Sequence, residues 1–149
     1  MSGAQDLDIH LLTSCDSWVG GEGEHLGASL LIRYRSQLNR KVDTSNHPHL
    51  IITTWSYSAH PSGMPSPEES AVMNDFETAL VGEVEHDVMG VLAAVITNAG
   101  ARRWVFYARS AEQFVQRFNI IAIKHGSRTA TPEIWFDPEW NHFFKDIAP

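Results

Sequence analysis

One stretch, from Val91 to Arg109, constrains the fold of this chain more than any other. It reads VLAAVITNAGARRWVFYAR. Val91–Thr97 is apolar or β-branched throughout, which predicts a strand buried on both faces. Asn98–Gly100 follows, and both Asn and Gly tolerate the positive φ of tight turns. Arg102–Ala108 is again rich in aromatic and β-branched residues. The stretch therefore predicts two antiparallel strands, joined by a short loop, at the centre of a sheet.

A further strand and a helix precede this hairpin. Leu50–Tyr57 is dense in Ile, Thr, Trp and Tyr, which predicts a strand. Ser66 is followed by a proline and, three residues on, by a glutamate, which is typical of a helix start. Glu83 falls inside the apolar arc of this helix, so we expect fraying or bending after Gly82. The apolar face consists of Val72, Met73, Phe76, Leu80 and Val84, and we expect Asp75, Thr78 and Glu85 on the opposite face, towards water.

Another helix, a strand and a short terminal helix follow the hairpin. Ser110 repeats the capping pattern, and Gly126 offers a stop. Glu133–Phe136 is predicted to be a short strand. The sequence Asp-Pro-Glu at Asp137–Glu139 then starts a last helix. The apolar residues expected to pack are Phe114, Phe118, Ile121, Ala122 and His125 in the longer helix, and Trp140, Phe143, Phe144 and Ile147 in the shorter one.

The N-terminal third is less regular. Residues 1–14 begin polar, and Asp16–Gly20 leads into a glycine-rich run, Gly-Gly-Glu-Gly-Glu, that we interpret as a turn. Leu26–Tyr34 reads as a strand, so the two segments predict a hairpin that extends the sheet or covers its second face.

The order of elements from Leu50 predicts an α+β fold. Strand, helix, strand, strand, helix and strand make the split βαβ, or ferredoxin-like, plait: a four-stranded antiparallel sheet with two helices. The strand at Leu50–Tyr57 is expected beside Arg102–Ala108. We expect a single domain over residues 1–149. Its parts are the N-terminal hairpin and connection (1–49), the ferredoxin-like core (50–136) and the C-terminal helix (137–149).

Composition narrows the class of protein. An apolar content of 43% and a charged content of 19% are ordinary for a globular domain of 149 residues. Cys15 is the only cysteine, so neither an intrachain disulfide nor a four-cysteine metal site is available. The N-terminus lacks the features of a secretory signal, and no apolar run has the length of a membrane span. These features predict a cytoplasmic protein.

Charge is unevenly distributed along the chain, whose net charge is −7. Residues 66–101 contain seven acidic residues and no Lys or Arg, whereas residues 102–128 contain six basic residues and one acidic residue. Arg33, Arg35, Arg40 and Lys41 form another basic group. Two interpretations remain open: a dipolar surface that steers a charged partner, or blocks that neutralise each other across neighbouring elements.

Several of these motifs resemble a known family. They are PSGMPSPEES before the first helix, the hairpin ending in RRWVFY (102–107), and the closing DPEW (137–140). Over roughly Trp18 to Phe144 the chain is similar to an uncharacterised bacterial domain of unknown function (DUF), whose fold looks like that of the RNase E regulator B family. The resemblance implies a plait without known catalysis, and members of that regulator group act by binding another protein. It implies no particular binding residue.

Three groups of residues carry side chains that metal sites or catalysts use. His47, His49 and His60 offer imidazole ligands or a small-molecule pocket, but no carboxylate or cysteine stands at a recognised ligand spacing. Cys15 is better explained as a small structural residue than as a nucleophile. We therefore expect no cofactor and no metal. The last group lies in a segment expected to be a solvated tail: Asp6, Asp8 and His10.

RNA binding is a competing interpretation, because exposed aromatic residues on a ferredoxin-like sheet stack bases. The stacking pair would be Trp104 and Phe106, or Val105 and Tyr107. The sequence lacks the glycine–aromatic spacing of that RNA-binding module, and the chain is acidic. We expect that Trp104 and Phe106 are not both exposed, since a bare aromatic face is unusual in a soluble monomer.

The resulting hypothesis is a non-catalytic protein-binding module. A small, acidic, single domain without a catalytic constellation fits an inhibitor or immunity-type protein that presents an acidic helix to a basic partner, such as a nuclease or toxin. The alternatives are an RNA-binding plait, or an enzyme, metal-binding or small-molecule domain using a pocket near His47, His49 and His60. The predicted partner-binding residues are Glu68, Asp75, Glu77 and Glu85.

Overall fold

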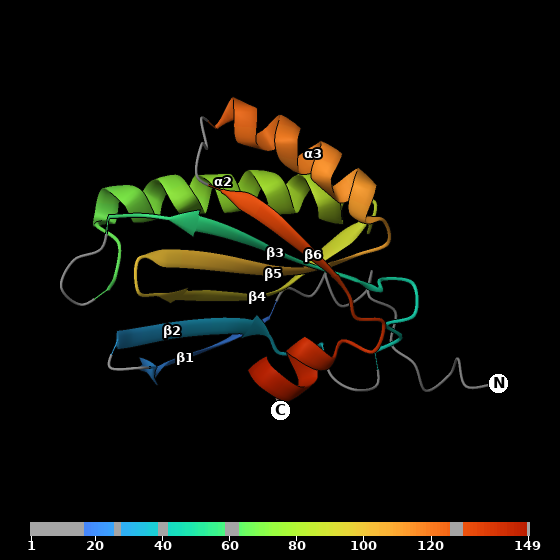
Figure 1. The fold of residues 1–149 in the computed structure, drawn as a ribbon, viewed down its shortest axis with the longest axis horizontal. Helices are drawn as coiled ribbons and strands as arrows, with labels where there is room; N and C mark the ends of the chain where they lie inside the picture. Colours follow the sequence, from blue (N-terminus) through green and yellow to red (C-terminus); the bar gives the residue numbers. More distant parts are fainter. Residues whose placement is uncertain (1–16, 26–27, 39–41, 59–62, 126–129, 149) are drawn as a thin grey trace.

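A six-stranded antiparallel sheet forms the middle of the molecule, with the strand order β1-β2-β4-β5-β3-β6 (Figure 1). The structure is a computed structural model that describes residues 17–25, 28–38, 42–58, 63–125 and 130–148. The α+β class is thus confirmed. Of the two alternatives for the N-terminal hairpin, the structure shows the one in which it extends the sheet, so the four expected strands become six. The strands are β1 (Trp18–His25), β2 (Ala28–Arg35), β3 (His49–Ser56), β4 (Gly90–Asn98), β5 (Ala101–Ala108) and β6 (Thr131–Phe136).

The predicted central hairpin is confirmed in β4 and β5. They are joined at Ala99 and Gly100, whose φ angles of 49° and 81° suit the turn that matches the twist of paired strands. Every residue of the two strands except Ile96 and Arg103 is buried. The pairing slips between Leu92 and Ala94, where β4 forms a bulge. The expected pairing of β3 with β5 is also present.

Two helices, α2 (Pro67–Glu85) and α3 (Ala111–Lys124), cover one face of the sheet (Figure 1). Both predicted caps are confirmed: the Ser66 hydroxyl accepts from Glu69 N, and Ser110 accepts from Gln113 N. Helix α2 continues through Glu85, so the expected fraying after Gly82 is wrong. In the part of the chain that the structure describes, no helix is long and apolar enough to cross a membrane.

The opposite face of the sheet is covered by the C-terminal segment. Here one turn of π-helix, η1 (His142–Ile147), follows Trp140, whose ring stacks on Tyr107 with 4.2 Å between the centroids. The helix therefore begins later than the predicted Asp137, whose carboxylate accepts from His142 N. Residues packed on this face include Leu50, Val105, Phe143 and Phe144.

Because both faces are covered, the aromatic residues of β5 are enclosed. Trp104, Phe106, Val105 and Tyr107 each have no exposed surface. The prediction that Trp104 and Phe106 are not both exposed is confirmed. Neither pair is free to stack RNA bases.

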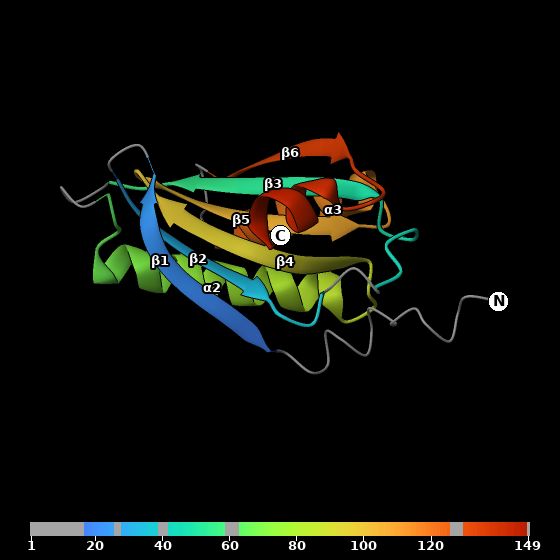
Figure 2. The same cartoon turned by 90° about the horizontal axis from the view of Figure 1, so that it is seen from below.

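The N-terminal hairpin differs from the prediction in its strands. The glycine-rich run, interpreted as a turn, lies within β1 and pairs with β2 from Trp18↔Arg35 to His25↔Ala28. Glycine tolerates the extended backbone, and the ladder to β2 supplies the hydrogen bonds that hold it there. Strand β2 in turn pairs with β4, so this hairpin lies at one edge of the sheet and β6 at the other (Figure 2).

Candidate functional site

Three arginines lie between the sheet and α2. Arg33 and Arg35 belong to β2, and Arg102 belongs to β5. Alternate residues of a strand point to the same face, so Arg33 and Arg35 share the side of β2 that meets α2. The three arginines differ in their partners: Arg33 and Arg35 pair with carboxylates, whereas Arg102 bonds to neutral groups.

Arg35 is fully committed to the fold. Its side chain is 2% exposed, and its guanidinium donates to both carboxylate oxygens of Glu85, at 3.0 and 3.3 Å. The pair sits at the bulge of β4, where Arg35 donates to Leu92 O at 3.0 Å and Glu85 accepts from Leu92 N at 2.8 Å. The N–H and C=O of Leu92, next to the bulge, therefore have their hydrogen bonds supplied by the Arg35–Glu85 ion pair.

Arg33 also has a carboxylate partner. It pairs with Glu77, which in addition accepts from the Trp104 indole N–H at 2.8 Å. The guanidinium of Arg33 lies 5.1 Å from the centroid of Trp18, and that of Arg35 lies 4.9 Å from the same ring. Arg33 keeps 36% of its side chain exposed, so part of its head remains in contact with solvent.

Arg102 is buried without a carboxylate. It is 7% exposed, and its two partners are neutral: Nε donates to Thr97 Oγ1 at 2.9 Å, and Nη1 donates to Asn74 Oδ1 at 3.0 Å. None of the ion pairs among the described residues includes it. Burial lowers the pKa of the Arg102 guanidinium, Glu77 raises it, and the charge of Arg33 lowers it again. Arg102 thus carries a desolvated positive charge that no direct contact neutralises.

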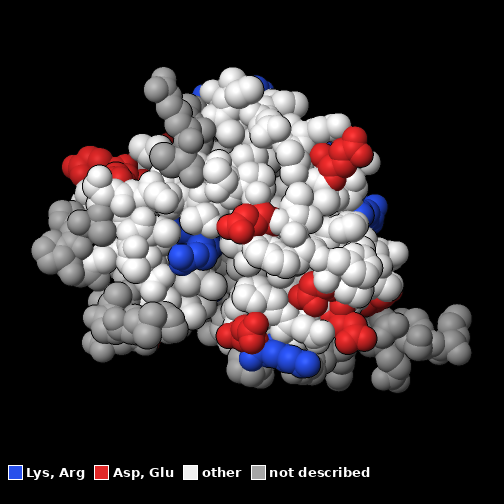
Figure 3. All heavy atoms as spheres, in the orientation of Figure 1, with Lys and Arg blue, Asp and Glu red and all other residues white. Residues whose placement is uncertain are grey.

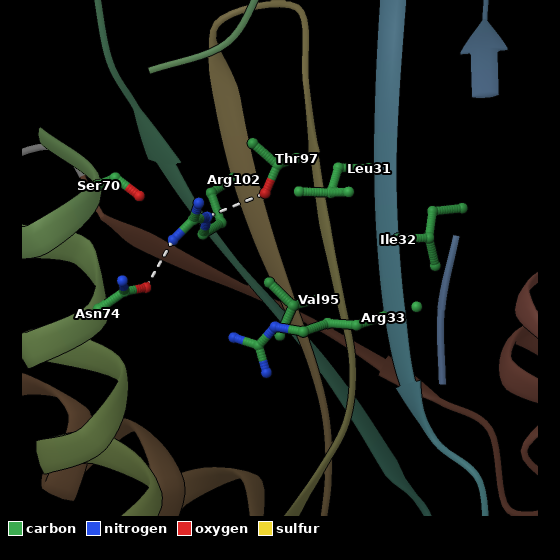
Figure 4. Close-up of a pocket in the computed structure, with 9 residues that line it drawn as sticks. Leu31, Ile32, Arg33, Ser70, Asn74, Val95, Thr97 and Arg102 are labelled. Carbon is green, nitrogen blue, oxygen red and sulfur yellow. Dashed lines mark hydrogen bonds between the residues drawn. The ribbon is translucent and has the colours of Figure 1, made fainter. Parts of the chain in front are cut away.

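A cleft of about 260 Å³ opens beside Arg102, between α2 and strands β1, β2, β4 and β5. In Figure 4, Ser70 and Asn74 project from α2 towards the head of Arg102, which lies between Asn74 and Thr97. The Ile32 side chain points away from the cleft, so its contribution is backbone. The side chains that line the cleft are Leu31, Arg33, Ser70, Asn74, Val95, Thr97 and Arg102. A guanidinium fork with neighbouring hydroxyl and amide groups suits a carboxylate or phosphate.

The predicted acidic site is only partly present. Glu68 and Asp75 are exposed on α2 as expected. Glu77 and Glu85 are not free surface charges, because their side chains are 16% and 12% exposed and pair with the arginines of β2. The assignment of Glu85 to the water-facing side of the helix is therefore wrong. Val72, expected in the core, is 49% exposed.

Among the described residues, arginines pair with three of the seven acidic residues in 66–101. Besides the two pairs with β2, Arg117 of α3 holds Asp87, with 2.7 Å between Nη2 and Oδ2, and this hydrogen-bonded pair keeps the pKa of Asp87 well below its usual value. On the face drawn in Figure 3, acidic and basic side chains are scattered in small groups. The geometry favours mutual neutralisation over a dipolar surface.

The histidines do not converge in the described residues. His47 is buried, its Nε2 lies 2.8 Å from Val88 O, and burial lowers the pKa of its ring. His49 lies in β3 against Phe136, with 5.8 Å between ring centroids. Within the described ranges no three His, Cys, Asp or Glu side chains form a group suited to a metal. The other candidates lie outside those ranges: His60, Cys15, Asp6, Asp8 and His10.

Sequence reasoning missed the arginine cleft. The signal was present in β2, whose sequence ASLLIRYR places Arg33 and Arg35 in phase with Leu31, at positions where an apolar residue is expected in a covered strand. Arg102 gave no comparable signal, because its significance depends on which strand and helix lie beside it.

Comparison with known proteins places this architecture in a family. The chain belongs to the family of unknown function DUF695, whose model matches residues 22–146. A comparison with curated proteins gives no match. The expectation of a family of unknown function is thus confirmed, and the likeness to the RNase E regulator B family stays a prediction.

Proposed function

We propose that this DUF695 member is a non-catalytic binding module that takes a carboxylate or phosphate group in the cleft beside Arg102. The observation that carries the proposal is the contrast between two buried arginines. Arg35 has a carboxylate partner inside the protein, whereas the partners of Arg102 among the described residues are a hydroxyl and an amide. A buried charge is expensive unless it is paired, so the pairing that Arg102 lacks is supplied by a ligand.

The shape of the cleft limits the ligand. A volume of about 260 Å³ is below the range typical of drug-sized ligands, so the site suits one anionic group with a short body. Leu31 and Val95 provide apolar contact for that body, while Ser70 and Arg33 extend the polar rim. No group of the described cleft is a nucleophile paired with a base, which is why binding rather than turnover is proposed.

Thermal unfolding in added anion tests this assignment. Inorganic phosphate and acetate are the probes, compared with chloride at equal ionic strength so that screening is matched, and used at millimolar concentrations, where the general stabilisation by excluded anions is small. At about 100 times its Kd a ligand stabilises by roughly 2.7 kcal/mol, which corresponds to a Tm rise of about 5 to 10 °C for a domain of this size. Arg102→Gln is expected to abolish the rise. Arg103→Gln is the matched control. Arg103 is the next residue of β5, its side chain points to the other face of the sheet, and it donates to Asn98.

The stability of Arg102→Gln without added anion is a second test. If Arg102 serves a ligand, Arg102→Gln folds at least as stably as the wild type, since it removes a desolvated charge. A wild-type protein indifferent to both anions, or an Arg102→Gln variant that still responds to them, would refute the proposal.

A second candidate function retains the protein-binding hypothesis. Val72 is 49% exposed and lies between Glu68 and Asp75 on the outer side of α2, giving an apolar spot flanked by two acids. A basic protein partner in the cytoplasm, such as a nuclease or toxin neutralised by an inhibitor or immunity-type protein, complements that charge. With a partner isolated by pull-down, Glu68→Lys with Asp75→Lys should slow association about tenfold at low salt, while Glu112→Lys on α3 should not. Equal rates for both variants would remove this candidate.

We also propose that β3 to β6, with α2 and α3, form a ferredoxin-like plait. The strand order β4-β5-β3-β6, the antiparallel pairing and the placement of both helices on one face support this assignment. The proposed likeness to the RNase E regulator B family rests on the same features. An experimental structure whose strands follow another order would exclude it.

A further inference from the structure

The second edge of the sheet, strand β6, exposes an unusual amount of apolar surface. Three consecutive large residues are exposed there: Ile134 by 47%, Trp135 by 46% and Phe136 by 73%. Among the described strands, β6 pairs only with β3 and ends the sheet (Figure 2). An edge strand with apolar side chains and unpaired backbone groups is a template for another strand.

The register fixes which backbone groups of β6 face outward. Asp137 N donates to Pro48 O at 2.7 Å, one position beyond the pair Phe136↔His49. Bonded and non-bonded pairs alternate along an antiparallel ladder, so residues 135, 133 and 131 bond to β3. Phe136, Ile134 and Pro132 therefore direct their backbone groups outward. The proline agrees with this orientation, because its missing N–H costs the β3–β6 ladder nothing.

We propose that β6 pairs antiparallel with β6 of a second copy of this chain, about a two-fold axis through Ile134. The outward groups of Ile134 exchange two hydrogen bonds with those of Ile134 of the second copy. Phe136 N–H then reaches Pro132 C=O of the second copy, and the same bond recurs by symmetry. Proline has no donor, but in this register it is required only as an acceptor.

No other centre serves as well. An axis through Glu133 would place the two Glu133 side chains opposite each other and would require a donor from Pro132, which has no N–H. An axis through Trp135 would place Glu133 opposite Asp137, which are also like charges. An axis through Pro132 or Phe136 would leave part of the strand unpaired. The axis at Ile134 also places Glu133 opposite Trp135, so like charges are not opposed. Such a self-complementary contact gives a closed dimer with one sheet continuous across both copies.

Side chains fit the same arrangement. On the side facing the helices, Ile134 meets Ile134 and Phe136 meets Pro132. On the other side, Trp135 lines a groove of about 420 Å³ together with Lys145, Asp146 and Asp137. Asp137 accepts from Tyr107, and Asp146 pairs with His142. Lys145 forms no ion pair with another described residue, so it is the cation available to Glu133 of the second copy.

The opposite edge lacks these properties. Strand β1, WVGGEGEH, has three glycines that leave register loose and two glutamates that repel their copies. Self-association is therefore assigned to β6 and not to β1.

Sedimentation and light scattering of the full chain test the dimer. At ~100 μM the wild type is expected at twice the monomer mass, with dissociation on dilution. Ile134→Pro removes one outward-facing N–H from each copy and should give a monomer. Phe136→Lys places a charge at a position that is 73% exposed and should also give a monomer. Val19→Lys, on the exposed surface of β1, is the matched control and should remain dimeric. Circular dichroism verifies that each variant is folded.

A register-specific cross-link distinguishes this dimer from any other. In a Cys15→Ser background, Ile134→Cys places two thiols on the axis, with Cα atoms about 5.5 Å apart, a separation that a disulfide spans. The variant should oxidise to a covalent dimer, while Ile120→Cys on the exposed side of α3 should not. A wild type that is monomeric at ~100 μM, a dimer that survives both β6 substitutions, or absence of the Ile134→Cys cross-link would overturn the proposal.

Discussion

Replacing Glu85 tests the distinction between acidic residues that support the fold and those on the surface. Glu85 is 12% exposed, its carboxylate pairs with Arg35 at 3.0 Å, and it also accepts from Leu92 N at 2.8 Å. Glu85→Ala leaves Arg35 buried without its counter-charge and the bulge of β4 without its acceptor. Removing one member of a buried pair costs about 3 to 5 kcal/mol.

That loss is large relative to the stability of a small domain, which is on the order of 5 to 15 kcal/mol. We expect urea unfolding, followed by tryptophan fluorescence, to show the full decrease with an unchanged m-value. In thermal unfolding the decrease corresponds to about 6 to 20 °C. Asp75→Ala on the same helix is the control, and its cost should stay below ~0.5 kcal/mol because the side chain is exposed.

A paired substitution identifies the cause. If the cost of Glu85→Ala comes from the unpaired charge of Arg35, then Arg35→Met combined with Glu85→Leu recovers most of the stability. A Glu85→Ala variant within ~0.5 kcal/mol of the wild type would contradict the reasoning, as would a double variant no more stable than Glu85→Ala.

Three smaller changes probe other contacts. Tyr107→Phe removes a hydroxyl that donates to Asp137 at 2.8 Å and accepts from Phe143 N at 3.3 Å; urea unfolding should show a loss of about 1 to 3 kcal/mol, and no loss would argue against this buried network. Ala99→Asn relieves a φ of 49° in the central turn and should raise stability by about 0.5 to 1 kcal/mol, whereas a decrease would contradict the turn assignment. The pKa of His47 is lowered by burial from 6.5, so the unfolded chain binds a proton that the folded protein refuses. Stability should therefore fall as pH drops below that value and down to the folded pKa, and His47→Gln should flatten this part of the profile.

The sequence was most informative where local pattern and burial coincide. The hairpin of β4 and β5 was predictable because a continuous apolar run beside an Asn-x-Gly turn has few alternatives. Glu85 was misplaced because a helical wheel assigns every charge to water and contains no information about β2. The strand register brings Arg35 to Glu85 and Arg102 to Asn74 across long separations in the chain. The cleft arises from these long-range pairings, which periodicity within single elements does not reveal.

The hairpin of β1 and β2 is attached by the β2–β4 ladder, by ion pairs and by the half-buried side chains of Trp18 and Tyr34. Among its side chains of described exposure, Arg35 alone is buried. The β1–β2 hairpin therefore unfolds locally as a unit while the two apolar cores around β4 and β5 remain folded. Amide protons of β2 should therefore exchange with solvent earlier than those of β5. Because Leu31 and Arg33 of β2 form one wall of the cleft, an anion bound there would hold this unit closed and slow exchange in β2 selectively.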